Sequence, residues 1–142
     1  MKMTYVQGIP ILRPYIDFDN EEFWKAHQEG KLVFQQCKNC GLTVHRPRPM
    51  CPRCLDTEPN WVESTGLGKI YSWTTFRYDR AAYPGIQVPY IVVLVDMVEG
   101  VRMLSNLEGV EPEDIEVGMP VEVFFDRVDD DLVLPKFKRR ET

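Results

Sequence analysis

Short runs of alternating apolar and polar residues fill the second half of the chain. Tyr90–Val98 is a β-branched run whose end alternates, and Met119–Val128 places Val121, Val123 and Phe125 on one face. We expect strands at 69–78, 90–98, 101–107, 119–128 and 132–138, a turn at 99–100, and one helical turn at 111–116. Five strands in about 75 residues are typical of a small closed barrel, for which a five-stranded OB fold is the commonest solution.

A helix signal lies nearer the N-terminus, after residues 1–16, which contain glycine and proline and are expected to be irregular. Asp19 fits an N-cap with Glu22 as its capping-box partner. Phe18 and Phe23 occupy the two positions of a hydrophobic staple. A glycine is the natural stop, so the pattern predicts a helix over residues 20–29.

Two adjacent large aromatics, Phe23 and Trp24, need a place to pack on this short helix. They either pack on the chain's own core or dock on a partner. The sequence leaves both interpretations open.

Four cysteines form two Cys-x-x-Cys pairs with ten residues between them: Cys37, Cys40, Cys51 and Cys54. Each pair turns tightly enough for both thiolates to face one ion, and four sulfurs suit tetrahedral zinc. Flanking strands are expected at 32–36, 42–45 and 61–63, as in a ribbon. Iron is a possible substitute for zinc, and paired disulfides are the disfavoured alternative.

A site closed by four thiolates has no open coordination position, so the expected zinc, one per chain, is structural rather than catalytic. The segment is too small for a core of its own, and the metal is expected to replace one. His45 lies between the two pairs and is expected to be a surface residue rather than a ligand.

Charge is distributed unevenly along the 142 residues. Residues 31–55 hold five bases and no acid, whereas residues 56–142 hold nine bases and 17 acids. The acidic excess argues against a whole-protein electrostatic grip on nucleic acid. The longest apolar stretch, residues 90–95, is far shorter than the ~20 residues that cross a bilayer. No signal-peptide core is present, and we expect a cytoplasmic protein with no membrane partner.

Catalytic motifs are missing from the sequence. It has no dinucleotide fingerprint, no P-loop, no Gly-x-Ser-x-Gly elbow and no His-Glu-x-x-His pair. Catalysis by this chain alone is therefore the weaker expectation.

The connection between the first two expected barrel strands, residues 78–89, is long for a hairpin and contains Arg80 and Tyr83. Long loops on rigid barrels tend to carry function. Together with Phe23 and Trp24, this loop is a candidate surface for a partner. The alternative is that its prolines only stiffen an exposed connection.

The order of helix, double-knuckle ribbon and Gly-x-Gly-x-x-Tyr-Ser is specific. The matching motifs lie at residues 66–74, 89–90, 99–102, 118–121 and 134–137. From about residue 17 to residue 137, the chain resembles the family of rubredoxin-like zinc-ribbon plus OB-fold proteins long labelled as of unknown function.

This resemblance implies a role in acyl-CoA metabolism, whether of lipids or of aromatic acids. Members of the family are similar to companion subunits of thiolases, thiolase-like synthases, and aldolases or hydratases that act on CoA thioesters. The implied function is a non-catalytic subunit of a hetero-oligomer that stabilises its partner and helps hold the coenzyme A thioester. Arg48 and Arg53 of the ribbon, or Arg80, are candidates to meet the CoA phosphates.

The sequence therefore predicts a mainly β protein in three parts. These are an N-terminal extension and helix (1–30), a rubredoxin-like zinc ribbon (31–63) and a five-stranded OB-fold barrel (64–142).

Two other functions stay open beside the companion subunit. The first is single-stranded nucleic-acid binding, in which Tyr71, Trp73, Phe76 and Tyr78 would stack on bases. Alternate positions on a first barrel strand are more often core, and the acidic barrel speaks against this alternative. The second is a stand-alone CoA-binding enzyme.

Overall fold

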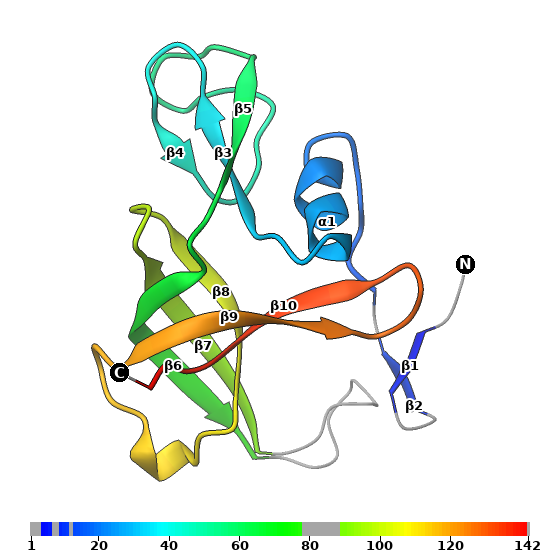
Figure 1. The fold of residues 1–142 in the computed structure, drawn as a ribbon, viewed down its shortest axis with the longest axis vertical. Helices are drawn as coiled ribbons and strands as arrows, with labels where there is room; N and C mark the ends of the chain where they lie inside the picture. The colour runs from blue at the N-terminus through cyan, green and yellow to red at the C-terminus, as the bar shows by residue number, and fades with distance from the viewer. Residues whose placement is uncertain (1–3, 7–8, 12, 78–88, 142) are drawn as a thin grey trace.

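The computed structural model describes residues 4–6, 9–11, 13–77 and 89–141 (Figure 1). Its elements are β1 (Thr4–Val6), β2 (Ile9–Ile11), α1 (Glu21–Gln28), β3 (Val33–Cys37), β4 (Thr43–Val44), β5 (Pro59–Glu63), β6 (Leu67–Phe76), β7 (Tyr90–Met97), β8 (Arg102–Glu108), the 3₁₀ turn η1 (Pro112–Asp114), β9 (Pro120–Arg127) and β10 (Val133–Arg139). The expected mainly β fold with one N-terminal helix is confirmed.

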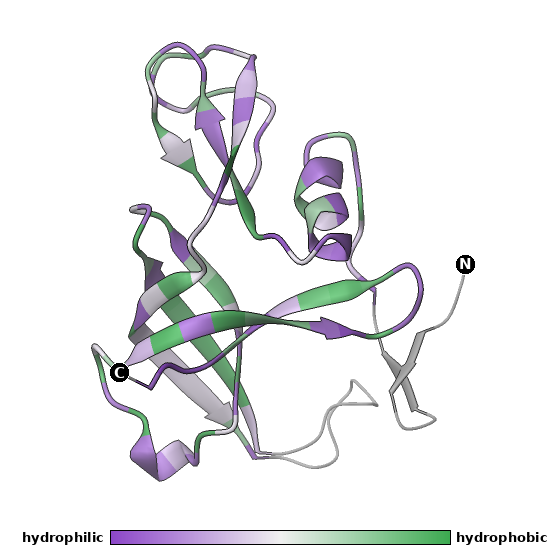
Figure 2. Cartoon of the chain, in the orientation of Figure 1, coloured by the Kyte–Doolittle hydropathy of each residue, from purple (hydrophilic) through white to green (hydrophobic). Residues whose placement is uncertain are grey.

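Five strands close into a barrel in the order β10-β8-β7-β6-β9. β10 pairs parallel with β8 and antiparallel with β9, and this pairing closes the sheet. Alternate side chains fill the interior, where Val93, Val95, Val121 and Phe137 are fully buried. Figure 2 shows hydrophobic residues concentrated along these strands. The five-stranded OB fold expected from the alternation is confirmed.

A β-bulge in β6 changes which side chains face the barrel interior. Ile70 pairs with Val95 and Ser72 with Leu94, so Tyr71 is the extra residue between two paired positions. Before the bulge Ile70 is buried, whereas Tyr71 is 47% exposed. Simple alternation would place the aromatic residues of β6 in the core. This expectation is wrong for Tyr71 and also for Phe76, which is 39% exposed.

The ribbon is a three-stranded antiparallel sheet in the order β4-β3-β5, which lies over one end of the barrel beside α1 (Figure 1). Its base shares one hydrophobic core with the helix and the barrel, because Phe23, Leu32 and Phe34 are buried in the same cluster as the barrel interior. The position of the ribbon relative to the barrel is thus set by apolar packing.

Helix α1 begins and ends within one residue of the expected range, but its N-terminus is built differently. The N-cap is Asn20, without a side-chain capping bond. Instead, the Asp17 carboxylate accepts the backbone N–H groups of Asp19 and Asn20, at 3.0 and 3.1 Å. The expected staple is wrong, because Phe18 is 89% exposed whereas Phe23 is buried. The turn before the helix therefore replaces the capping box.

A short hairpin of β1 and β2 lies where irregular structure was expected. Tyr5 and Pro10 are paired positions in its register. A two-stranded hairpin has only edge strands, which tolerate a proline because the missing N–H need not pair. The expected loop residues Arg80 and Tyr83 lie outside the described residues, as does Tyr78.

Candidate metal centre

Two backbone turns of the same design hold the four cysteines. In the first, the N–H of Cys37 donates to the Leu42 carbonyl and that of Gly41 donates to the Cys37 carbonyl, both at 2.9 Å. In the second, the N–H of Cys51 donates to the Asp56 carbonyl at 2.8 Å. The N–H of Leu55 donates to the Cys51 carbonyl at 3.0 Å. These bonds fold each Cys-x-x-Cys pair into a knuckle.

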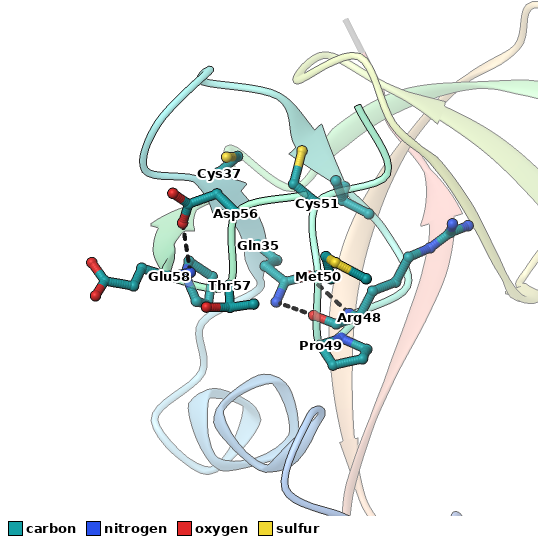
Figure 3. Close-up of a pocket in the computed structure, with 11 residues that line it drawn as sticks. Gln35, Cys37, Arg48, Pro49, Met50, Cys51, Asp56, Thr57 and Glu58 are labelled. Atoms are coloured by element: carbon teal, nitrogen blue, oxygen red, sulfur yellow. Dashed lines mark hydrogen bonds between the residues drawn. The ribbon is translucent and has the colours of Figure 1, made fainter. Parts of the chain in front are cut away.

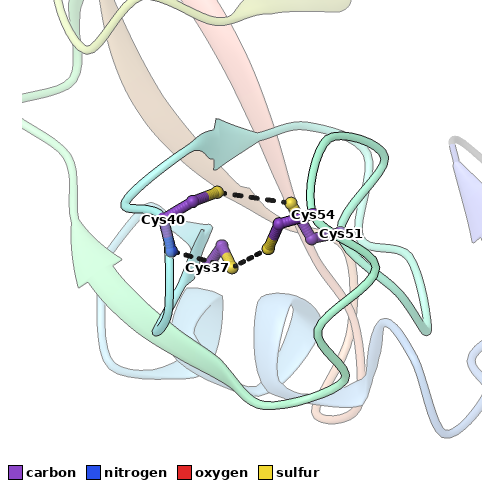
Figure 4. A group of neighbouring side chains, drawn as sticks. All are labelled: Cys37, Cys40, Cys51 and Cys54. Atoms are coloured by element: carbon purple, nitrogen blue, oxygen red, sulfur yellow. Dashed lines mark hydrogen bonds between the residues drawn. The ribbon is translucent and has the colours of Figure 1, made fainter.

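The knuckles bring the four sulfurs into one cluster (Figure 4). The Sγ atoms of Cys37, Cys40, Cys51 and Cys54 all lie within 4.8 Å of one another. Two Sγ pairs are closer still, Cys37 with Cys54 at 3.4 Å and Cys40 with Cys51 at 3.6 Å. Tetrahedral zinc with bonds of about 2.3 Å separates its sulfurs by about 3.8 Å. The donor set and its spacing therefore fit one zinc ion with no coordination position left over.

Backbone donors favour thiolates at this centre. The Cys40 N–H points at the Cys37 sulfur, at 3.5 Å, and the Arg53 N–H at the Cys51 sulfur, at 3.4 Å. The backbone of Leu42, followed by the Arg53 side chain, lowers the pKa of Cys40 to about 6. Although the Cys40 N–H favours the Cys37 thiolate, burial and the neighbouring Cys54 and Cys40 thiols outweigh it and raise the pKa of Cys37 to about 11. Metal ligands must be deprotonated, so the donors prepare Cys40 for zinc at neutral pH, whereas Cys37 has to release its proton as the metal binds.

A buried glutamine fixes the loop between the two knuckles. The Gln35 amide donates to the Arg48 carbonyl and accepts from the Arg48 N–H, both at 2.8 Å (Figure 3). Beside this pair lies a hollow of about 10 Å³, the space of a single water. Gln35 therefore binds the loop as a neighbouring strand would, and the Arg48 side chain is left exposed.

His45 is not a metal ligand, but the expectation that it lies on the surface is wrong. Its ring packs against Phe23 and Phe34, with centroids 5.2 and 5.4 Å away. Burial lowers the pKa of His45 to about 4. His27 of α1 is more deeply buried, at 1% exposure, and its ring lies 4.5 Å from that of Phe23. An aromatic cluster therefore joins the helix, the ribbon and the barrel.

The other expected site residues divide between the interior and the surface. Of the two interpretations left open for the helix aromatics, Phe23 follows the first, because it packs on the chain's own core. Trp24 is partly buried against the same core. Arg48 and Arg53 are exposed on the ribbon, where a guanidinium nitrogen of Arg53 donates to the Cys40 carbonyl at 2.8 Å. The expected association of these groups with Arg80 and Tyr83 falls outside the described residues.

A groove on the barrel was not predicted from the sequence. It has a volume of about 410 Å³. Its lining comes from β6, the end of β7 with the turn that follows, the loop before β9 and the residue after β10, including Lys69, Tyr71, Val98 and Arg140. The Arg102 guanidinium stacks over the Tyr71 ring, 3.5 Å from its centroid. The signal that marks this groove is the bulge at Tyr71, which alternation alone does not reveal.

No helix among the described residues is long and apolar enough to cross a membrane.

Two family models match consecutive parts of the chain. Residues 24–60 match the rubredoxin-like zinc ribbon domain of ChsH2. Residues 61–126 match the C-terminal OB-fold domain of ChsH2. The first match contains all four cysteines, which confirms the zinc-ribbon interpretation and one structural zinc.

Curated relatives include subunits of enzymes that act on CoA thioesters. A probable enoyl-CoA hydratase alpha subunit of Thermomonospora curvata is 37% identical over 89% of this chain, which spans only 39% of that relative's length. A DUF35 domain-containing scaffold protein of Pyrococcus furiosus is 32% identical, covering 83% of this chain and 89% of the relative. A benzoylsuccinyl-CoA thiolase subunit, BbsA, of Geobacter metallireducens is 29% identical, covering 68% of this chain and 65% of that relative's length.

A solved structure is similar over almost the same region. A chain of the Ltp2-ChsH2(DUF35) aldolase superposes with a TM-score of 0.83 at 36% identity, covering 89% of this chain and 98% of that chain. With the ribbon, the barrel and these relatives together, the chain belongs to the DUF35 family of ChsH2-type zinc-ribbon and OB-fold proteins.

Proposed function

We propose that this protein is a non-catalytic accessory subunit of an acyl-CoA-processing enzyme. The observation that carries the proposal is the likeness, at 36% identity and a TM-score of 0.83, to a chain of the Ltp2-ChsH2(DUF35) aldolase. The hydratase and thiolase subunits among the relatives support the same class of partner, because all of them are named for CoA thioesters. A thiolase-superfamily enzyme is the partner we favour. The cytoplasm, where thiols stay reduced, is the compartment we propose.

The metal centre supports a scaffolding role. Four thiolates fill a tetrahedral zinc, so the ion has no position for a substrate or an activated water. What the ion supplies is folding free energy for the ribbon. The ribbon in turn keeps the exposed arginines Arg48 and Arg53 at fixed positions above the barrel.

The experiment that tests this proposal compares the chain alone with the chain plus its partner. Alone, the purified protein should neither cleave nor hydrolyse acyl-CoA. With the partner, turnover should appear or rise. Robust turnover by this chain alone, abolished by replacing one of its polar residues, would contradict the proposal and favour a stand-alone enzyme.

Contacts to CoA are a finer part of the proposal. An arginine–phosphate pair is charge-assisted and often bidentate, so Arg48 and Arg53 of the ribbon, or Arg80, are our candidates to bind CoA phosphates at the partner's channel. Arg48→Ala and Arg80→Ala should weaken activation of the complex without changing the zinc content. Trp24→Ala should weaken assembly. Arg77→Ala is the matched control, since Arg77 is exposed and paired with Glu113 at 3.1 Å. Normal assembly and turnover in all three test variants would contradict this choice of surface.

A further inference from the structure

The groove on the barrel has the size and the apolar lining of a small-molecule site. Its volume of about 410 Å³ lies in the usual range of ligand pockets, roughly 300–1,000 Å³. Leu67, Val98 and Val117 contribute apolar side chains to the lining. Val98 and Val117 are 67% and 73% exposed, so a ligand with an apolar body would remove this surface from water.

Tyr71 is a fixed part of this lining. The β-bulge directs it out of the barrel, and the Arg102 guanidinium lies 3.5 Å from its ring centroid. Arg102 in turn donates hydrogen bonds of 2.7 and 3.5 Å to the carboxylate of Asp96. Asp96 is the one carboxylate among the described residues that line the groove, and Arg102 already offsets its charge. Bulges that redirect a side chain in this way are common beside functional sites.

Two cations of the groove have no counter-ion. Within the described parts of the chain, neither Lys69 nor Arg140 forms an ion pair with a carboxylate. The acids next to lining residues in the sequence, Glu99, Glu116 and Glu141, do not line the groove themselves. The groove therefore carries an uncompensated positive charge beside its apolar surface.

Arg140 also holds an unsatisfied hydrogen-bond donor. Its Nε is buried, and no described group accepts a hydrogen bond from it. The backbone N–H of Arg140 donates to the Pro120 carbonyl at 3.0 Å, which fixes the residue where β10 ends. Burial of a charged donor without an acceptor is costly, and native proteins rarely leave one unpaired. An anion bound in the groove that Arg140 lines would supply the acceptor.

We propose that the groove binds an organic carboxylate. The carboxylate group pairs with Arg140 and Lys69, and the apolar body of the ligand lies against Tyr71, Val98 and Val117. A guanidinium matches the planar geometry of a carboxylate and binds it through charge-assisted hydrogen bonds. The inference goes beyond the proposed function, because the site lies within this chain and needs no partner subunit.

NMR titrations of the zinc-loaded chain with hexanoate test the site. Acetate carries the same anion without the apolar body, hexan-1-ol carries the body without the charge, and inorganic phosphate supplies a different anion without a body. Hexanoate should shift the backbone signals of residues 69–71, 98 and 117–118. It should bind at least about ten-fold more tightly than each of the other three probes, because it alone uses both parts of the groove.

Two substitutions each remove one cation and keep an apolar stem. Arg140→Met and Lys69→Met should each weaken hexanoate binding by about ten-fold. Lys25→Met is the matched control, because Lys25 is an exposed cation of α1 outside the groove, and its affinity should be unchanged. Arg140→Met also removes the unsatisfied donor, so the folded-to-unfolded ratio of the zinc-loaded chain should not fall. Should that variant fail to fold, Lys69→Met and its control decide the outcome.

The outcomes separate this inference from the proposed function. A preference for hexanoate that the groove variants lose and the control keeps supports the site. Equal affinity for acetate or phosphate overturns the role of the apolar lining, and equal affinity for hexan-1-ol overturns the role of the cations. No binding, or binding that the groove variants leave unchanged, overturns the site altogether. Hexanoate binding by a chain that associates with no acyl-CoA-processing enzyme would contradict the proposed function alone.

Discussion

Gly68 of strand β6 pairs with Met97 of β7 in the barrel wall. A Cβ built at this position would lie 2.5 Å from Cγ1 of Val95 and 2.8 Å from the backbone oxygen of Asp96. The backbone oxygen belongs to the barrel ladder and cannot move aside, so the strands can pair here only without a side chain.

Gly68→Ala should lower the free energy of unfolding by about 2 kcal/mol, because the added methyl group overpacks the barrel wall. Urea unfolding of the zinc-loaded protein measures this loss. Gly109→Ala is the control: its φ is +77° and nothing lies within 4 Å of the new Cβ, so only the backbone strain of about 1 kcal/mol is expected. Equal losses for the two variants would show that close packing at Gly68 is not the cause.

His27 couples stability to pH. Burial, opposed by the backbone of Val133 and assisted by nearby His45, lowers the pKa of His27 from 6.5 to about 4. Below pH 6.5 the unfolded chain therefore takes up a proton that the folded chain does not. Stability should fall by roughly 1.4 kcal/mol per pH unit for this histidine until pH 4.

His27→Phe should flatten this part of the pH profile. Acid also releases zinc, but the variant keeps all four cysteines, so the difference between the wild-type and variant unfolding curves isolates the histidine. We expect that difference to change steadily between pH 6.5 and pH 4 and to be constant above pH 7. Parallel curves through the whole range would contradict the proposed effect of burial.

At the scale of elements, periodicity predicted the barrel well because its strands bury alternate residues. β7 to β10 begin and end within one residue of the expected bounds. Where the structure differs from the expected pattern, the causes lie in residues far away in the sequence. The bulge at Tyr71 depends on where β7 and β9 pair with β6, and the packing of His45 depends on Phe23, 22 positions earlier in the chain. The cysteine spacing predicted the metal site because its ligands lie within two local turns.

A substitution of Gln35 tests how strand β3 fixes the loop between the knuckles. Gln35→Leu should lower the free energy of unfolding by about 2 kcal/mol, because both hydrogen bonds to the Arg48 backbone are lost. Gln36→Leu is the neighbouring control, since its side chain has one long bond, 3.4 Å, to Thr43. Chemical denaturation measures both. A larger loss in the control would contradict the bracing role of Gln35.

At the scale of the whole molecule, the metal stands in for a core that the ribbon cannot build. One continuous apolar cluster joins the helix, the base of the ribbon and the barrel, but it does not extend to the knuckles. Figure 2 shows hydrophilic and hydrophobic residues mixed along the outer turns of the ribbon. Net charge also differs between the ribbon and the barrel: residues 31–55 are basic, whereas the residues that follow them carry an excess of acids.

Loss of one zinc ligand should therefore unfold the ribbon. Cys40→Ser should reduce the zinc content from about one ion per chain and remove on the order of 10 kcal/mol of metal-linked folding free energy. The barrel signals in an NMR spectrum should persist more than those of residues near the knuckles. Metal analysis is the direct check, and a fully folded, metal-free wild-type protein would refute the zinc assignment.

The most direct test of the central claim is the molar mass, by light scattering, of the protein mixed with its acyl-CoA-processing partner, with turnover measured on the same sample. We expect one species containing both subunits, and turnover above the sum of the separate proteins. Two unassociated species, with the partner fully active by itself, would contradict the role as an accessory subunit.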